Sequence, residues 1–122
     1  NCPRRLVDVL FPGTPMEEAA KRLVALGASE VTVTDGDSGA WFFDANTALH
    51  QPAIPVDAVD TNGAGDVFTG AMIFLTMQNR PPEERLRFAT AAAALKCQQL
   101  GNRDALPSLE KIESLLGDRD SD

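Results

Sequence analysis

The chain is poor in the residues and runs that build disulfide frameworks, metal knuckles and membrane spans. Its two cysteines, Cys2 and Cys97, are too few and too far apart for a disulfide framework or a metal knuckle. Free thiols are typical of a reducing compartment, so we expect a cytoplasmic protein. No apolar run approaches the roughly 20 residues that cross a bilayer, and no signal-peptide core follows Arg4 and Arg5. We therefore expect no membrane partner.

Basic residues are also in the minority. Eleven lysines and arginines stand against eighteen acidic residues, which gives a net charge of −7. This balance argues against the phosphate backbone of a nucleic acid as a partner. It does not exclude a mononucleotide, because backbone N–H groups, a magnesium ion and one or two cations can hold phosphates in an otherwise acidic protein.

The order of predicted elements indicates an α/β layered fold in a chain long enough for one small domain. Alternating or β-branched residues predict strands over residues 5–11, 31–34, 40–43 and 53–59. Apolar residues at helical spacing predict helices over 15–26, 66–79, 83–100 and from 109 onward, with Thr14 and Ser108 as caps of the first and last. We find no internal repeat and no dividing linker.

The stretch from Asp60 to Asp66, Asp-Thr-Asn-Gly-Ala-Gly-Asp, combines a glycine-rich turn, a helix start and an acid. An extended segment, glycines and then a helix form an arrangement that collects backbone N–H groups around an anion. Gly63 and Gly65 can adopt positive φ and let phosphate oxygens approach, while Asp66 can accept a proton from an attacking hydroxyl. The pattern predicts phosphoryl transfer. Taken alone, stabilisation of a helix start by Asp66 explains it equally well.

Other polar and aromatic residues have simpler explanations when each is taken alone. The stretch from Thr34 to Gly39 is typical of a hairpin turn, and Asp60 is expected to fix its own turn through an Asx-type bond. His50, the only histidine, is predicted on the solvated surface. Three basic side chains of the 83–100 helix are predicted on a solvated face: Arg85, Arg87 and Lys96.

Together these motifs resemble the ribokinase-like (PfkB) carbohydrate kinase family. The resemblance runs from about Val9 to Leu116 and rests on Thr34-x-Gly36-x-x-Gly39, on the Asp60–Asp66 signature, on an alanine-rich helix, and on Gly101 and Pro107. The alanine-rich helix looks most like that of bacterial fructokinases and ketohexokinases. The resemblance implies an α/β fold, the C-terminal portion of a ribokinase-like three-layer α/β/α sandwich. Residues 1–122 would be a single partial domain without the N-terminal half and the lid.

The resemblance also implies roles for individual residues. Asp66 matches the general base that takes a proton from the sugar hydroxyl, and Gly63, Ala64 and Gly65 match the anion hole. The other matches are an ATP-binding turn with Thr34, Gly36 and Gly39, an adenine pocket near Thr90 and Ala93, and a monovalent-cation loop with Asp60, Asn62 and carbonyls near Lys96, Gln99 and Gly101. ATP and Mg²⁺ are the implied cofactors. Activation by K⁺ is left open, because Arg103-Asp104-Ala105 departs from the small residues usual there.

Two departures from the family pattern matter for function. The absent N-terminal half supplies most sugar contacts and the lid, through which any homodimer would form. The Asn-x-x-Glu segment that helps to position Mg²⁺ is missing, since Pro12 is followed at once by Gly13-Thr14-Pro15. We therefore predict an ATP-dependent kinase acting on a small-molecule sugar. Two alternatives stay open: a non-catalytic nucleotide-binding remnant, and a nucleoside kinase of the adenosine kinase type.

Overall fold

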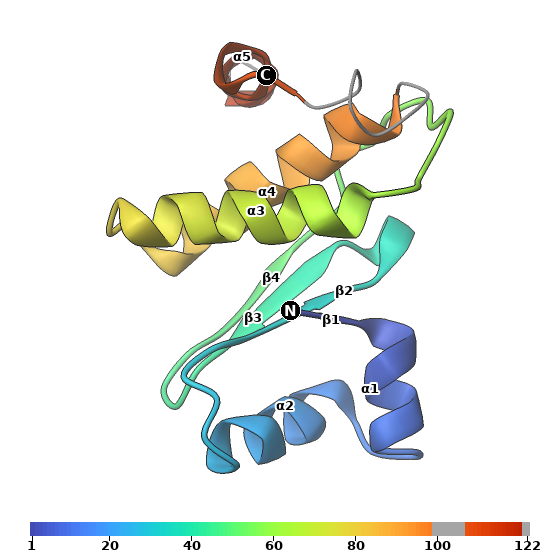
Figure 1. Ribbon diagram of the computed structural model, residues 1–122, viewed down its shortest axis with the longest axis vertical. Coiled ribbons are helices and arrows are strands. Elements are labelled where there is room, and N and C mark those ends of the chain that lie inside the picture. The colour runs from blue at the N-terminus through green and yellow to red at the C-terminus, as the bar shows by residue number, and fades with distance from the viewer. Residues whose placement is uncertain (99–106, 121–122) are drawn as a thin grey trace. The chain divides into compact units, whose positions relative to one another are not determined.

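The computed structural model describes residues 1–98 and 107–120 (Figure 1). The chain divides into two compact units, Asn1–Pro52 and Ala53–Asp122, and each is described by itself. No helix in the described ranges combines the length and the apolarity that a membrane crossing requires.

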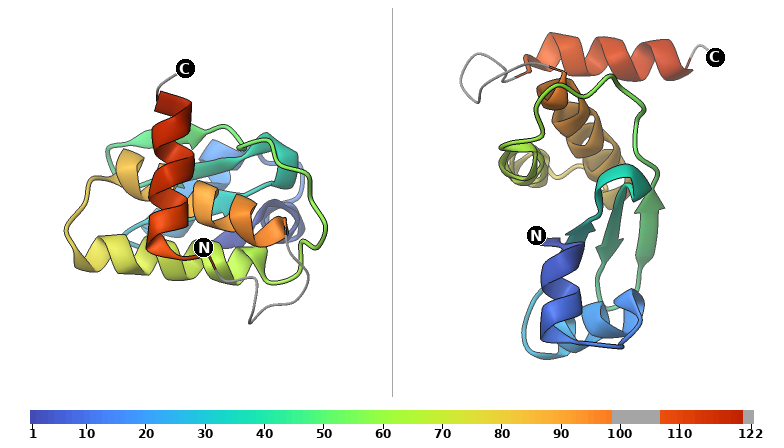
Figure 2. Two further views of the ribbon diagram at one scale, coloured as in Figure 1. Left: turned by 90° about the horizontal axis from the view of Figure 1, so that it is seen from above. Right: turned by 90° about the vertical axis from the view of Figure 1, so that its right-hand side faces the viewer.

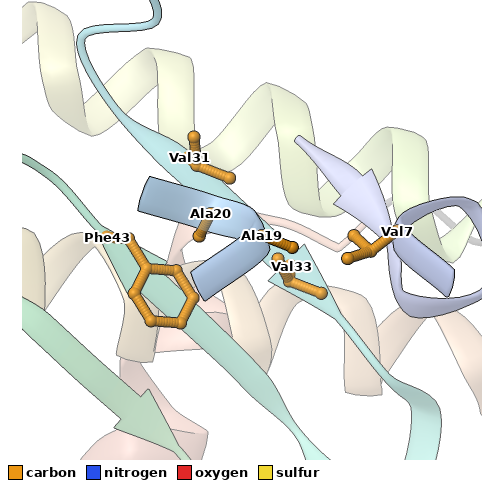
Figure 3. Packing of buried hydrophobic residues seen from close by; sticks show 6 residues of the cluster. All are labelled: Val7, Ala19, Ala20, Val31, Val33 and Phe43. Atoms are coloured by element: carbon orange, nitrogen blue, oxygen red, sulfur yellow. The ribbon is translucent and has the colours of Figure 1, made fainter. Parts of the chain in front are cut away.

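The first unit is a four-stranded sheet with two helices. The strands lie in the order β1 (Cys2–Pro3), β2 (Val31–Thr34), β3 (Ala40–Phe43) and β4 (Ala48–Gln51), the first pair parallel and the others antiparallel. Helices α1 (Arg4–Leu10) and α2 (Met16–Ala25) complete the unit. Their buried side chains meet those of β2 and β3 in one apolar core, which Figure 3 shows: Val7, Ala19, Ala20, Val31, Val33 and Phe43.

Residues 5–11 were predicted as a strand, but all of them except Phe11 lie in helix α1, and only Cys2–Pro3 of this part of the chain pair with the sheet. A short apolar run does not separate strand from helix by periodicity alone. The helix places Val7 in the core and brings Arg4 within 3.2 Å of Asp8, one turn later. The burial of Val7 depends on the folded unit, so the local pattern gave the wrong element.

The predicted strand over 53–59 is also misplaced, since the third long strand is β4, at Ala48–Gln51. Pro52 and Pro55 lack the N–H groups that a sheet ladder needs, which accounts for the strand ending before them. The predicted Thr14 cap is wrong as well. Helix α2 begins at Met16 after Pro15, and the Thr14 amide donates to the Phe11 carbonyl at 3.1 Å.

The second unit contains the helices α3 (Ala64–Met77), α4 (Pro82–Cys97) and α5 (Leu109–Asp120). The first two pack side by side, and α5 crosses α4 (Figure 2). Small residues allow this close packing, with Ala91 and Ala92 buried beside Ile54 and Ile112. The predicted end of α3 is confirmed by Asn79, which adopts φ 58 just before the two prolines. The predicted cap of α5 is confirmed too, because the Lys111 amide donates to Ser108 Oγ at 3.2 Å.

Candidate active site

The glycine turn leads directly into helix α3. Gly63 precedes the helix with φ 80, in the left-handed region that favours glycine, as the sequence predicted. Gly65 is the second helical residue and has no positive φ. Asp66 follows in the first turn, with an exposed side chain. The acid therefore lies at the positive end of the helix dipole, where a negative charge is stabilised.

The first turn of α3 leaves backbone donors available. The Ala64 amide donates to the Thr61 carbonyl at 3.2 Å, and the Val67 amide to Gly63 at 3.0 Å. Within the described residues, the amides of Gly65 and Asp66 donate no hydrogen bond. Unpaired amides at a helix N-terminus bind anions. Three residues were predicted to form the anion hole. Gly63 forms the turn, the amide of Ala64 already donates to Thr61, and the amide of Gly65 is free to donate to a ligand.

A pocket of about 500 Å³ lies among the three helices of the second unit. Asp66 and Lys96 are the charged residues among the described residues that line it, and Gly63 lies on its wall. The rest of the lining is apolar and includes Phe74 of α3, Phe88 of α4 and Ile112 of α5. The candidate base thus borders a pocket whose lining has few polar groups.

Asp60 connects the glycine turn to the end of α4. Its Oδ1 accepts the Asn62 amide at 2.9 Å, which confirms the predicted Asx-type bond. Its Oδ2 lies 3.5 Å from Lys96 Nζ, and Lys96 Nζ also donates to the Asp60 carbonyl at 3.1 Å. The Cys97 carbonyl accepts the Val59 amide at 2.6 Å and the Asp60 amide at 3.0 Å.

Lys96 is therefore the residue of the candidate site whose environment was predicted wrongly from the sequence. It was predicted on a solvated face together with Arg85, yet both side chains are buried, and Lys96 has no exposed surface. The ion pair with Asp60 accommodates the buried charge, and Arg85 donates to Thr76 Oγ1 at 2.9 Å. One signal was available: Lys96 follows the alanine run on the same helical stripe as Ala92.

The buried ion pair also affects its neighbour Cys97. Partial burial raises the pKa of the Cys97 thiol, because the thiolate loses hydration. The positive charge of Lys96 acts in the opposite direction, and the negative charge of Asp60 adds to the effect of burial. The thiol is thus held in its protonated, less nucleophilic form near neutral pH.

The stretch from Thr34 to Gly39 forms the hairpin connection between β2 and β3 in the first unit, as one prediction had it. A 3₁₀ turn spans Gly36–Ser38, and Gly36 and Gly39 have φ 44 and 93. The exposed His50, on β4, places Nε2 2.8 Å from the Ser38 carbonyl and stacks on Trp41 at 4.3 Å. The glycines match the chain reversal, and their role toward ATP stays a prediction.

The remaining predicted site residues lie elsewhere on α4 or outside the described residues. Thr90 is buried and donates to the Leu86 carbonyl at 2.7 Å, while Ala93 is half-buried. Gln99, Gly101 and Arg103-Asp104-Ala105 lie outside the described residues. Across residues 1–98 and 107–120, no three His, Cys, Asp or Glu side chains are grouped to hold a metal ion. The α4 residues that do line the pocket are Phe88, Ala92 and Lys96.

Comparison with known proteins covers most of the chain. The model of the pfkB family carbohydrate kinase matches residues 9–109. The ribokinase of Lactococcus lactis is 35% identical over 107 residues, which are 88% of this chain and 34% of that protein. A putative ribokinase II from E. coli, in complex with ATP and Mg²⁺, has a similar fold, with TM-score 0.89 and 31% identity over 95% of this chain and 38% of that one. Arabidopsis thaliana ribokinase, complexed with ribose and ATP, has TM-score 0.86 and 32% identity. The match covers 93% of this chain and 39% of the Arabidopsis chain. The chain thus spans about a third of the length of its curated relative.

Proposed function

The chain belongs to the pfkB family of carbohydrate kinases, and on that premise we propose that it is the C-terminal catalytic part of an ATP-dependent sugar kinase. One observation carries the proposal. Asp66 lies in the first turn of α3 beside the unpaired amides of Gly65 and Asp66 itself, on the wall of an apolar pocket. Transfer of a phosphoryl group to a hydroxyl needs a proton acceptor and donors for negative charge in the same place.

In the proposed reaction, the Asp66 carboxylate accepts the proton of a sugar hydroxyl as the hydroxyl oxygen attacks the γ-phosphorus of ATP. The bond from the γ-phosphorus to the β–γ bridging oxygen breaks, and ADP is the leaving group. The amides of Gly65 and Asp66 stabilise the negative charge on the transferred group, and the dipole of α3 adds to this effect. Gly63 keeps the chain in the left-handed turn that presents these amides. The two amides act from fixed backbone positions, so little reorganisation of these donors accompanies the reaction.

The donor set fits the cofactors that the family implies. Unpaired amides at a helix N-terminus match phosphate oxygens, and two similar structures, the putative ribokinase II of E. coli and the ribokinase of Arabidopsis thaliana, are complexes with ATP. Mg²⁺ is usually held by one or two carboxylates together with substrate phosphates. Asp66 is assigned to the proton, and the Asn-x-x-Glu segment that would help to position the ion is missing from this sequence. When bound, the ion neutralises charge on the phosphates. The hairpin from Thr34 to Gly39 and the region of Thr90 and Ala93 are assigned to the nucleotide on the family resemblance.

A panel of acceptors assayed by ADP release on the full-length protein tests the function. We expect ribose or another sugar of the pentose, hexose and ketohexose classes to release ADP well above the rate without acceptor. Release with nucleosides alone would favour the adenosine kinase type. ATP binding by calorimetry without release for any acceptor would favour the non-catalytic remnant. A cytoplasmic location and a dimer through the lid stay predictions.

A further inference from the structure

Lys96 is a completely buried lysine at the end of α4. Lysine is almost never fully buried unless its charge is paired. Here the ammonium donates to the Asp60 carbonyl at 3.1 Å and lies 3.5 Å from Asp60 Oδ2. Its position in the last turn of the helix also lets it interact favourably with the carbonyl end of the dipole. The oxygens around this ammonium come from the segment that leads into the glycine turn.

Hydrogen bonds within residues 60–64 and to α4 tie the Lys96 ammonium to the segment that begins α3. Asp60, held by Lys96 and by the Cys97 carbonyl, accepts the Asn62 amide through its other carboxylate oxygen. Thr61 lies between Asp60 and Asn62, and its carbonyl accepts the Ala64 amide at 3.2 Å. Gly63 lies between the residues that these bonds hold. Its left-handed conformation determines where the first amides of α3 point.

We propose that Lys96 is a positioning residue whose ammonium serves as a built-in monovalent cation for the Asp60–Gly63 turn, so that phosphoryl transfer needs no added K⁺. The inference rests on the proposed function for its catalytic consequence. An ammonium and an alkali cation favour the same ligands, namely carbonyl and carboxylate oxygens. The Lys96 ammonium already contacts one of each on Asp60, the backbone carbonyl and the carboxylate Oδ2. Tethering the charge to α4 avoids the cost of capturing a free ion.

The test compares the full-length wild-type protein with Lys96→Met, which keeps an unbranched apolar stem and removes the charge. Wild-type turnover is expected to be the same in sodium, potassium and tetramethylammonium salts at equal ionic strength. Lys96→Met should lose about a hundredfold in kcat, the effect of a small misplacement of reacting groups. Potassium or ammonium ions should restore much of this loss in a saturable way, and tetramethylammonium, which is too large, should not. Lys21→Met is the matched control, since Lys21 is exposed and pairs with Glu17 on α2; its turnover should stay normal in every salt.

Each outcome decides the inference. Strong stimulation of the wild type by potassium would overturn it, and so would a folded Lys96→Met protein whose kcat no cation restores. If Lys96→Met does not fold, the wild-type salt comparison decides alone. If no acceptor supports turnover, the proposed function fails separately, and thermal melting tests the cation site. The Tm of Lys96→Met should then rise with potassium but not with tetramethylammonium, while the wild-type Tm responds equally to both; equal responses in the variant would overturn the inference.

Discussion

Replacing Asp66 with asparagine in the full-length protein is expected to lower kcat at least about a hundredfold, the low end of general-base contributions. Asparagine keeps the size of the side chain but cannot accept the proton of the attacking hydroxyl. The amides of Gly65 and residue 66 remain, so the affinity for ATP should change little. Steady-state kinetics give kcat, and calorimetry with ATP gives the dissociation constant.

The matched control for this variant is Glu83→Gln. Glu83 is an exposed acid in the first turn of α4, so it shares the helix-stabilising position of Asp66 without bordering the pocket. If Asp66 only stabilised its helix, both variants would lower Tm slightly and neither would change kcat. Near-normal turnover of Asp66→Asn would therefore remove the proposed role of the acid. Loss of turnover in both variants would point to a general effect of charge.

Gly65→Ala is expected to reduce kcat by about two orders of magnitude, similar to the loss of one oxyanion donor, without destabilising the protein. A Cβ at position 65 meets no protein atom within 4 Å, and the residue is helical without positive φ. The methyl group would occupy space that a phosphate needs to reach the amides of residues 65 and 66. Alanine in a helix favours folding by about 0.5–1 kcal/mol over glycine, so stability should rise slightly as activity falls.

Gly117→Ala controls for the helical effect of the same substitution. Gly117 lies in α5, and a Cβ there also meets no atom within 4 Å. We expect a small gain in Tm and unchanged turnover. Normal activity of Gly65→Ala would show that phosphate does not approach the backbone at this turn. A fall in both activity and Tm would show that the open space around Gly65 is filled in the full-length protein.

The glycine turn shows how far local chemistry predicts structure. The positive φ of Gly63 and the bond from Asn62 to Asp60 depend on residues within a few positions, and both predictions are confirmed. The same holds for the end of α3 at Met77, close before the left-handed Asn79, and for the Ser108 cap of α5. Turns and caps are fixed by neighbouring residues, so their sequence signals carry most of the information.

The errors concern residues whose environment depends on distant parts of the chain. Lys96 was placed on the surface because its partner, Asp60, lies 36 residues earlier and helical periodicity says nothing about it. The run from Arg4 to Leu10 is a helix, and this helix places Val7 in the core of its unit, among residues distant in sequence. The likeness of α4 to fructokinases and ketohexokinases stays a prediction, since the comparisons establish the family and leave the sugar open.

The amide resonances of Gly65 and Asp66 provide the most direct test of the proposed site. The full-length protein, labelled with ¹⁵N in glycine and aspartate, would be titrated with ADP, Mg²⁺, aluminium fluoride and the sugar it accepts, a mixture that mimics the transferring phosphoryl group. Our account predicts that the Gly65 and Asp66 amide protons move downfield as they bond to the anion, while the amide of Gly117 is unchanged. If Gly65 and Asp66 do not respond to a complex that inhibits turnover, then phosphoryl transfer takes place elsewhere and the account is wrong.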